Sequence, residues 1–198
     1  MSADPLTEPP RRALVLGIGN VLWADDGFGV RAAEALHAGW EMPDGVDVLD
    51  GGTQGLNLLG PVTEHACVLV FDALDFDLAP GSLRVLRDRE VPAWSATKVS
   101  LHQQGFQDLL AIAELHGRFP ARLTLIGVQP ERLSDFGGSL SESVRARLPQ
   151  AVALAVDELA AWGWRLAPRT AAAAERLNAP ALELAAYEQG RPDEAAAC

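Results

Sequence analysis

Residues 13–30 read Ala13-Leu-Val-Leu-Gly-Ile-Gly-Asn-Val-Leu-Trp-Ala-Asp-Asp-Gly-Phe-Gly-Val30, and this stretch decides the fold. Its apolar, β-branched start predicts a strand over residues 13–18 that ends in a tight loop. Asp25 and Asp26 lie side by side in that loop, just before a helical pattern that begins at Phe28. The loop after the first strand of an open α/β sheet is the usual place for working groups. This one carries acids and no phosphate-binding glycine pattern, which indicates a metal or acid–base site.

The composition fits one globular domain with a core on both sides of a sheet. The chain has 198 residues, of which 48% are hydrophobic and 22% are charged. A net charge of -11 leaves no basic surface for nucleic acid or anionic membranes. No stretch approaches the roughly 18 apolar residues of a membrane span. We therefore expect no nucleic-acid partner and no stable membrane association.

Cysteine use points to a reducing compartment. Cys67, in an apolar strand, and Cys198, the last residue, are the two cysteines. They support neither a disulfide framework nor a cysteine-rich zinc site. Arg11-Arg12 precedes apolar residues, but glycines and two aspartates break that run and no cleavage site of the export type follows. We predict a cytoplasmic protein.

Strands and helices alternate along the chain, which predicts an α/β fold built as a three-layer α/β/α sandwich. The run 66–71 is unbroken and apolar, as in a central parallel strand, and it ends on Asp72. Residues 82–87 alternate between polar and apolar, which suits an edge strand. Ser100 and Gln103 have capping-box spacing, so a helix begins there. Further strands are expected at 46–49 and 122–128, and further helices at about 28–38 and from Ser139 to Trp162 with a break at Pro149.

The chain divides into three parts by composition. Residues 1–12 are polar and proline-rich and predict a disordered N-terminal extension. Residues 13–167 carry the alternating elements and form the single α/β domain. Residues 168–198 form an alanine-rich C-terminal tail, with a helix expected at about 170–187 that has little to pack.

Asp26, Asp72 and His102 are the candidate metal ligands. Asp26 follows the first strand, Asp72 ends the central strand and His102 opens a later helix, so all three can converge on one sheet edge. Two carboxylates and an imidazole suit a borderline divalent ion such as zinc, nickel or iron, and leave positions open for water or substrate. Other interpretations stay open: Asp25 or Asp26 caps the following helix, Asp72 forms a turn, and His102 lies on the surface.

Five motifs, in order along residues 13–165, carry a family resemblance. They are Gly17-Ile-Gly-Asn-Val-Leu-Trp-Ala-Asp-Asp-Gly-Phe-Gly-Val30, Asp50-Gly-Gly-Thr-Gln-Gly-Leu-Asn-Leu-Leu59, Val70-Phe-Asp-Ala73, Ser100-Leu-His-Gln103 and Asp135-Phe-Gly-Gly-Ser-Leu-Ser141. The chain resembles the hydrogenase maturation endopeptidases, which trim the C-terminus of the large subunit of [NiFe] hydrogenases. It is most similar to the branch that serves membrane-bound uptake hydrogenases.

The resemblance implies a fold and a site. The fold is a mostly parallel, twisted sheet of the phosphorylase/hydrolase-like type, with one antiparallel strand, between helical layers. The metal-binding and catalytic residues are Asp26, Asp72 and His102. The first-loop acid of the family is usually glutamate, so Asp26 is one methylene shorter and Asp25 stays open as the ligand.

The resemblance also implies an activity. It is that of a nickel-dependent hydrolase, classed with aspartyl or metal-dependent endopeptidases, which removes the C-terminal peptide from the large-subunit precursor. The nickel is that of the precursor, and zinc or another divalent ion could fill the site in vitro. The loop 50–53 and the segment 135–141 are candidates for gripping the precursor, or ordinary connecting loops. Alternatives are a non-catalytic nickel-binding chaperone and a small-molecule α/β metallohydrolase.

Overall fold

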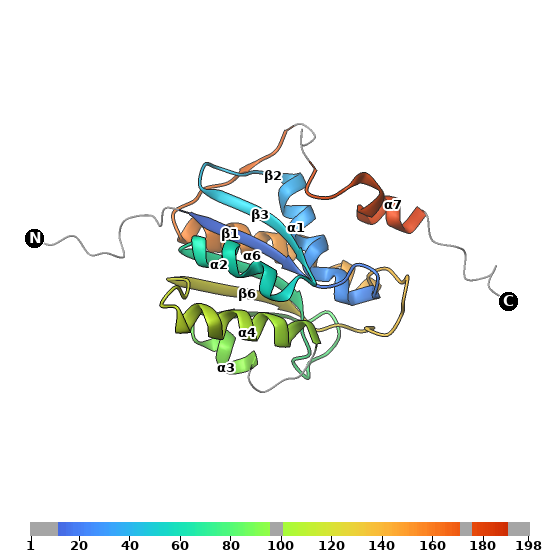
Figure 1. Cartoon of the computed structure of the whole chain (residues 1–198). Helices are drawn as coiled ribbons and strands as arrows, with labels where there is room; N and C mark the ends of the chain where they lie inside the picture. The colour runs from blue at the N-terminus through green and yellow to red at the C-terminus, as the bar shows by residue number, and fades with distance from the viewer. Residues whose placement is uncertain (1–11, 96–100, 171–175, 190–198) are drawn as a thin grey trace, which may run out of the picture.

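The computed structural model describes residues 12–95, 101–170 and 176–189, and the side chains of residues 93–95 and 101–104 lie outside this description. A five-stranded sheet crosses the molecule in the order β3-β1-β4-β6-β5 (Figure 1). Its strands are parallel except β5, which runs antiparallel to β6 at one edge. The strands are β1 (Ala13–Ile18), β3 (Val46–Gly52), β4 (Cys67–Ala73), β5 (Leu83–Arg87) and β6 (Arg122–Val128).

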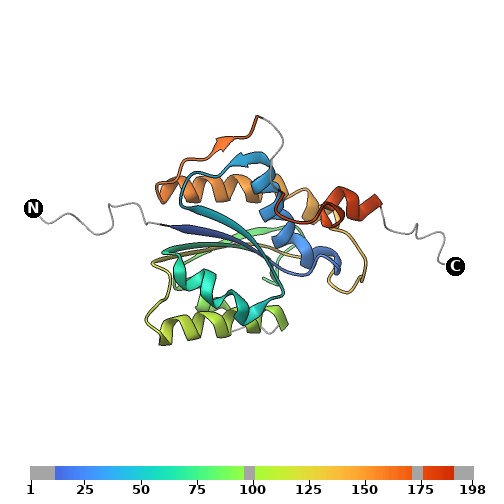
Figure 2. The ribbon, with the colours of Figure 1, turned by 45° about the horizontal axis from the view of Figure 1, so that its top comes forward.

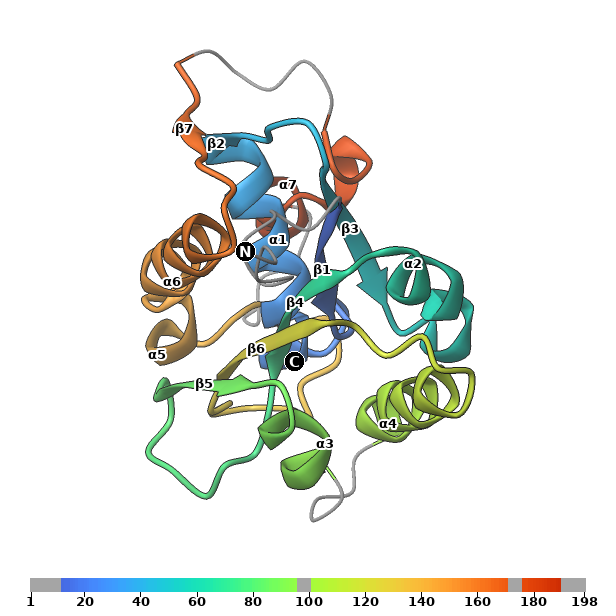
Figure 3. The same ribbon diagram turned by 90° about the vertical axis from the view of Figure 1, so that its left-hand side faces the viewer.

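Helices cover both faces of the sheet (Figures 2 and 3). On one face lie α1 (Phe28–Gly39), α5 (Glu142–Arg145) and α6 (Leu148–Ala161). On the other lie α2 (Leu59–Glu64), α3 (Glu90–Ser95) and α4 (Leu101–Leu115). A separate hydrophobic cluster fills each gap between helices and sheet. The predicted three-layer sandwich with one antiparallel strand is confirmed.

Alternation along β4 decides which helical layer each side chain faces. Leu69 and Phe71 belong to the cluster under α1 and α6, whereas Val68 and Val70 belong to the cluster under α4. Successive side chains of a strand point to opposite faces. Asp72, which lies inside the strand rather than after it, is therefore on the α4 side of the sheet. The prediction that this central strand is buried on both faces is confirmed.

The first turn of α1 lies directly against the carboxyl ends of β1 and β4. A Cβ atom added to Gly29 would lie 2.1 Å from the carbonyl oxygen of Ile18 and 2.2 Å from that of Phe71. A Cβ on Gly17 would lie 2.5 Å from the carbonyl oxygen of Gly29. These separations leave no room for a side chain. The two glycines therefore allow the chain to turn tightly from β1 into α1, above the strand that carries Asp72.

The helix expected from Ser139 to Trp162 begins later and is divided at a different place. It starts at Glu142, α5 ends at Arg145, and α6 starts at Leu148. Pro149 thus lies in the first turn of α6 and does not break a helix. Proline is tolerated there because the N–H that it lacks would have no partner within the helix.

The C-terminal segment packs against the domain, so the expectation that it has little to pack is wrong. Leu177 packs against the cluster of α1 and α6. The 3-10 helix η3 (Pro180–Leu182) and the helix α7 (Leu184–Gln189) follow it. The long helix expected at about 170–187 is also wrong for residues 176–183, where Pro180 interrupts helical hydrogen bonding. Residues 171–175 lie outside the described part of the chain.

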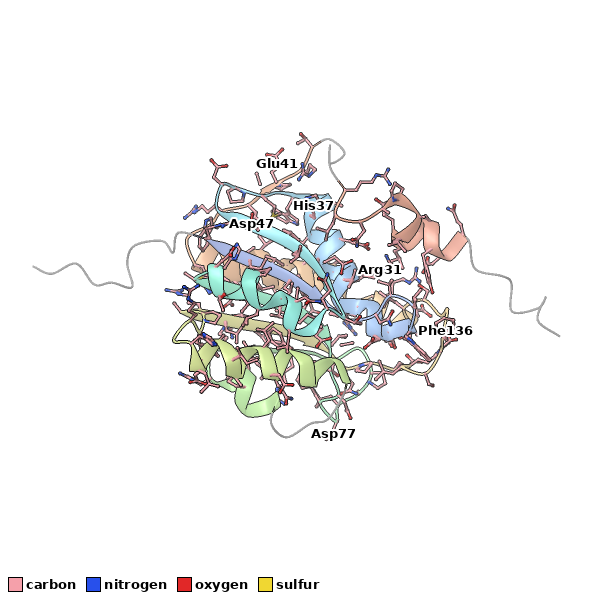
Figure 4. The ribbon with its side chains drawn as sticks, viewed as in Figure 1. Arg31, His37, Glu41, Asp47, Asp77 and Phe136 are labelled. Carbon is pink, nitrogen blue, oxygen red and sulfur yellow. The ribbon has the colours of Figure 1, made fainter. Side chains whose placement is uncertain are left out.

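Arg31 of α1 holds this segment in place. Its side chain is 3% exposed, donates a hydrogen bond to the carbonyl oxygen of Leu182, and pairs with Glu34 at 2.9 Å. The Arg31 guanidinium carbon lies 5.6 Å from the centroid of the Tyr187 ring, in cation–π geometry. The contacts of Arg31 with Leu182 and Tyr187 join residues more than a hundred positions apart in the sequence. Figure 4 shows Arg31 pointing from α1 toward the C-terminal segment.

Two smaller features complete the fold. The strands β2 (Trp40–Glu41) and β7 (Ala167–Pro168) pair antiparallel as a separate two-stranded ribbon. Among the helices of the described residues, none combines the length and the apolar character needed to cross a bilayer. The predicted N-terminal extension, except for Arg12, lies outside the described residues.

Glu188 links α7 to the loop before α5, and we predict that acid weakens this link. Glu188 accepts a hydrogen bond from Ser139 Oγ at 2.5 Å and pairs with Arg145. The hydrogen bond from Arg145 holds the pKa of Glu188 below its usual range. A carboxylate with a lowered folded-state pKa stabilises the folded form above its unfolded pKa, and that stabilisation is lost as the pH falls through the folded value.

Glu188→Gln should therefore show, at neutral pH, the reduced protection of α7 that the wild-type chain shows only in acid. Amide hydrogen exchange, corrected for the intrinsic rate at each pH, measures this protection. Equal protection factors in the two proteins at neutral pH would contradict the assignment.

We predict that Gly29→Ala destabilises the protein by about 1–3 kcal/mol, because its Cβ would overlap two backbone oxygens. Gly39→Ala, at the other end of the same helix, is the matched control. A Cβ there meets no atom within 4 Å, so this change should be neutral or slightly stabilising. Urea unfolding measures both free energies. A Gly29→Ala protein as stable as the wild type would refute the close approach.

Candidate active site

The loops that carry the predicted site residues lie at the carboxyl edge of the sheet, where its parallel strands end. At this edge β1 leads into the 3-10 helix η1 (Ala24–Gly27), and β3 leads into the 3-10 helix η2 (Gly55–Leu58). The pairing of β1 with β3 shifts register between Gly17 and Ile18, so that Ile18 lies opposite Gly52. Gly19 N then donates to Gly52 O at 3.0 Å. The 50–55 loop and the loop of Asp26 are thereby joined side by side.

Asp25 is a buried structural residue. Its side chain is 0% exposed. Oδ1 accepts from Ser141 N at 2.6 Å, and Oδ2 accepts from Glu131 N at 2.9 Å, Arg132 N at 2.8 Å and Ser141 Oγ at 2.9 Å. Both oxygens are therefore engaged by donors of the 131–141 segment, as burial of a carboxylate requires. Asp25 therefore anchors the 131–141 segment to the first loop.

Asp26 lies at the mouth of the same loop. Its side chain is 8% exposed and its Oδ2 accepts from Asn20 N at 2.9 Å. Gly19, with φ of 130°, permits this fold of the loop, because a Cβ there would lie 1.8 Å from Asp26 O. Neither aspartate caps α1, whose N-cap residue is Gly27 without a side-chain hydrogen bond. The interpretation of either acid as a helix cap is therefore wrong.

Asp72 occupies the end of the central strand. It is 5% exposed, and its Oδ1 accepts from Ala73 N at 2.8 Å. Asp72 is a strand residue and does not form a turn. Gly29, three residues after Asp26, touches the carbonyl of Phe71, which immediately precedes Asp72. The backbone thus carries the two predicted acids to neighbouring positions at one edge.

His102 is the second residue of α4, and its side chain lies outside the described residues. The backbone fixes where α4 begins. A Cβ on Gly105 would lie 3.2 Å from the Cα of Gly55, so the first turns of α4 pack on η2 at the carboxyl edge. Since α4 covers the face of the sheet that Asp72 shares, His102 starts the helix above that face.

A cavity of about 140 Å³ opens at this edge between β1, the 50–55 loop and α4. Its lining residues are Ile18, Gly52, Thr53, Gly55, Leu58, Gly105 and Phe106. Among side chains that the structure describes, no three His, Cys, Asp or Glu residues lie close enough together to hold a metal ion. The side chain of His102 is not among them, so the predicted ligand set stays a prediction.

Other chemically active side chains lie at the opposite edge. Cys67, the first residue of β4, is buried, and burial raises the pKa of its thiol to about 11, so it is protonated at neutral pH. His65 is held by Pro61 O at 2.6 Å and by Asp47 at 2.7 Å, and Asp47 also pairs with Arg12. The hydrogen bond from His65 lowers the pKa of Asp47. This cluster ties the start of β3 to the end of α2 and is structural.

Sequence reasoning missed the packing of the 131–141 segment on the first loop. Ala24 N donates to Gly138 O at 3.2 Å, and Gly137 N donates to Leu22 O at 2.7 Å. Trp23 and Phe136 form an isolated antiparallel bridge. The sequence shows only a tryptophan two residues before Asp25, which by itself does not reveal a partner more than a hundred residues away.

The chain is similar to proteins of hydrogenase maturation. Residues 30–158 match the protein family described as hydrogenase maturation protease. The chain is 54% identical over 182 residues to the hydrogenase expression/formation protein HoxM of Azotobacter vinelandii, covering 91% of this chain and 87% of that protein. It is 42% identical over 161 residues to the hydrogenase 2 maturation protease of Escherichia coli, covering 81% of this chain and 98% of the relative.

A solved structure shares the fold. The hydrogenase maturating endopeptidase HybD from E. coli superposes with a TM-score of 0.77 at 41% identity. The match covers 80% of this chain and 98% of HybD.

We predict that Asp25→Ala costs about 3 kcal/mol, because it leaves one buried and two partly buried backbone N–H groups without their acceptor. Ser141→Ala removes only the hydroxyl that donates to Asp25 Oδ2 and should cost about 1 kcal/mol. Urea unfolding measures both, and amide exchange at Glu131, Arg132 and Ser141 should quicken in Asp25→Ala. Equal losses in the two variants would show that Asp25 does not anchor this segment.

Proposed function

Since the chain belongs to the hydrogenase maturation protease family, we propose that Asp26, Asp72 and His102 bind the nickel ion of its substrate. The protein is an endopeptidase that cleaves the C-terminus of the precursor of a hydrogenase large subunit. In the same proposal, residues 13–167 form the protease domain and residues 168–198 form a C-terminal tail.

One observation carries the choice of ligands: two neighbouring acids of the first loop have different surroundings. Asp25 is enclosed by four donors, whereas Asp26 lies at the mouth of the loop beside the end of β4. Asp72 lies on the sheet face under α4, the helix that His102 opens. Carboxylate oxygens and an imidazole nitrogen form a donor set suited to nickel, zinc or iron.

Recognition through the metal explains how a protease can act on one bond of one protein. A precursor that already holds nickel offers an ion whose remaining coordination positions Asp26, Asp72 and His102 can fill. Coordination then orients the scissile bond, and correct orientation supplies a large part of the barrier reduction. A precursor without nickel would lack this anchor. Specificity thus comes from coordination geometry more than from a side-chain pocket.

Either carboxylate can also act as the general base that accepts a proton from the attacking water. Hydrolysis of a peptide bond requires a base that removes this proton and an acid that protonates the leaving amine. Asp26 and Asp72 are both less than a tenth exposed, which keeps bulk water away from the reacting groups. Nickel, as part of the substrate, would polarise the scissile carbonyl or the water.

The surrounding loops supply further contacts. The 50–53 loop borders the cavity at the carboxyl edge, and the 135–141 segment packs on the loop of Asp26. We assign both to gripping the precursor tail. The cytoplasm is the proposed place of this reaction, because the chain's cysteine use suits a reducing compartment.

We predict that Asp72→Asn and His102→Ala lower the processing rate by at least about 100-fold, because the first replaces a charged ligand of the nickel ion by a neutral one and the second removes a ligand. The measurement is the mass of the nickel-loaded precursor after incubation with the protein. Asp26→Glu should retain activity, since glutamate carries the same donor atoms. Nickel-free precursor should stay uncut, because it lacks the ion that these residues bind.

Asp108→Asn and His116→Ala are matched controls, since both residues are exposed and belong to α4 or its C-terminal end. They should process at the normal rate. If Asp72→Asn or His102→Ala also processed normally, the ligand assignment would be wrong. Transfer of nickel without a shortened precursor would instead indicate a chaperone, and hydrolysis of small molecules alone would indicate a metallohydrolase.

A further inference from the structure

Four large apolar side chains are exposed around the loop of Asp26. Leu22, Trp23, Leu133 and Phe136 are 40%, 37%, 47% and 67% exposed. Two come from the loop after β1 and two from the segment between β6 and α5. We call these four residues the apolar rim. Figure 4 shows Phe136 at the outer end of the molecule, at the carboxyl edge of the sheet.

Specific contacts hold the two segments of the apolar rim together. The rings of Trp23 and Phe136 lie 5.2 Å apart at 64°, in edge-to-face contact. Their backbones form an antiparallel bridge, flanked by the hydrogen bond from Gly137 N to Leu22 O. Asp25 anchors both segments through its bonds to Glu131 and Arg132. The rim is therefore held in shape before any partner arrives.

Exposure of the apolar side chains of the rim to water is energetically unfavourable. Contiguous exposed apolar patches on soluble proteins mark interaction sites. Tryptophan is among the residues that contribute most to protein–protein binding. Neither Trp23 nor Phe136 belongs to either hydrophobic cluster of the core.

We propose that the apolar rim is the docking surface for the folded body of the large-subunit precursor. This inference rests on the proposed function. Continuity with the site selects the occupant: Trp23 and Asp26 are three residues apart in one loop, so a precursor whose C-terminus reaches Asp26 also covers the rim. The partner surface is apolar and borders the precursor's C-terminal extension. Coordination of the metal then determines which bond is cleaved, and contact with the apolar rim determines which protein is bound.

The test is the concentration dependence of processing of nickel-loaded precursor. Trp23→Ala combined with Phe136→Ala should raise KM by at least about 10-fold and leave kcat within about 2-fold, because the rim contributes uniform binding energy. Phe136→Ser alone should raise KM in the same direction, and at 67% exposure it does not disturb the core. Trp23→Phe should largely restore KM. Leu115→Ala, which alters an 86% exposed leucine at the far end of α4, should change neither constant.

Other results would overturn the proposal. If KM is unchanged in the double variant while Asp72→Asn is inactive, the apolar rim is not a docking surface. The proposed function would still hold. A fall in kcat at constant KM would mean that the ring pair acts on the loop of Asp26. A wild-type dimer in sedimentation that the double variant dissociates would assign the rim to a second copy of the chain. Normal processing by Asp72→Asn or His102→Ala would count against the proposed function and not against the rim.

Discussion

The close contact between the first turn of α1 and the carboxyl ends of β1 and β4 is the constraint on which the site depends. Gly29 touches the carbonyl groups of Ile18 and Phe71, and Gly17 touches Gly29 in return. A side chain at either position would push α1 away from the sheet and lift η1 with it. Asp26, which precedes this turn, would then move away from Asp72, which follows Phe71. The absence of two Cβ atoms therefore brings together acids that are 46 positions apart in the sequence.

A second constraint gives the adjacent carboxylates of Asp25 and Asp26 different roles. Asp25 is enclosed by donors from the 131–141 segment, and Asp26 remains at the mouth of the loop. A buried charge of this kind is costly unless it is fully hydrogen-bonded, so Asp25 fixes the position of every donor around it. Because Asp26 is the next residue in the chain, these bonds also restrain its backbone. Preorganised donor atoms are what metal recognition by geometry requires.

The periodicity of the sequence predicted most of the fold because local patterns report burial directly. The apolar run before Asp72 predicted a central strand, and the alternation in 82–87 predicted an edge strand; both are present. The antiparallel direction of that edge strand came from the family resemblance and is also present. The C-terminal segment was mispredicted because its packing depends on Arg31 meeting Leu182 and Tyr187. No local pattern encodes such a contact. The roles of Asp25 and Asp26 were left open for the same reason, since the donors to Asp25 lie more than a hundred residues away.

The two constraints have a common consequence at the carboxyl edge. Asp25 joins the loop after β1 to the segment after β6, and the same junction brings Trp23 and Phe136 into edge-to-face contact. The interaction that immobilises the loop of Asp26 thus also assembles the apolar rim beside it. A partner bound to the rim therefore has a fixed position relative to Asp26. Because a few bonds to a metal ion supply orientation but little contact area, a protease that selects one protein gains from an area of contact built into the same loop.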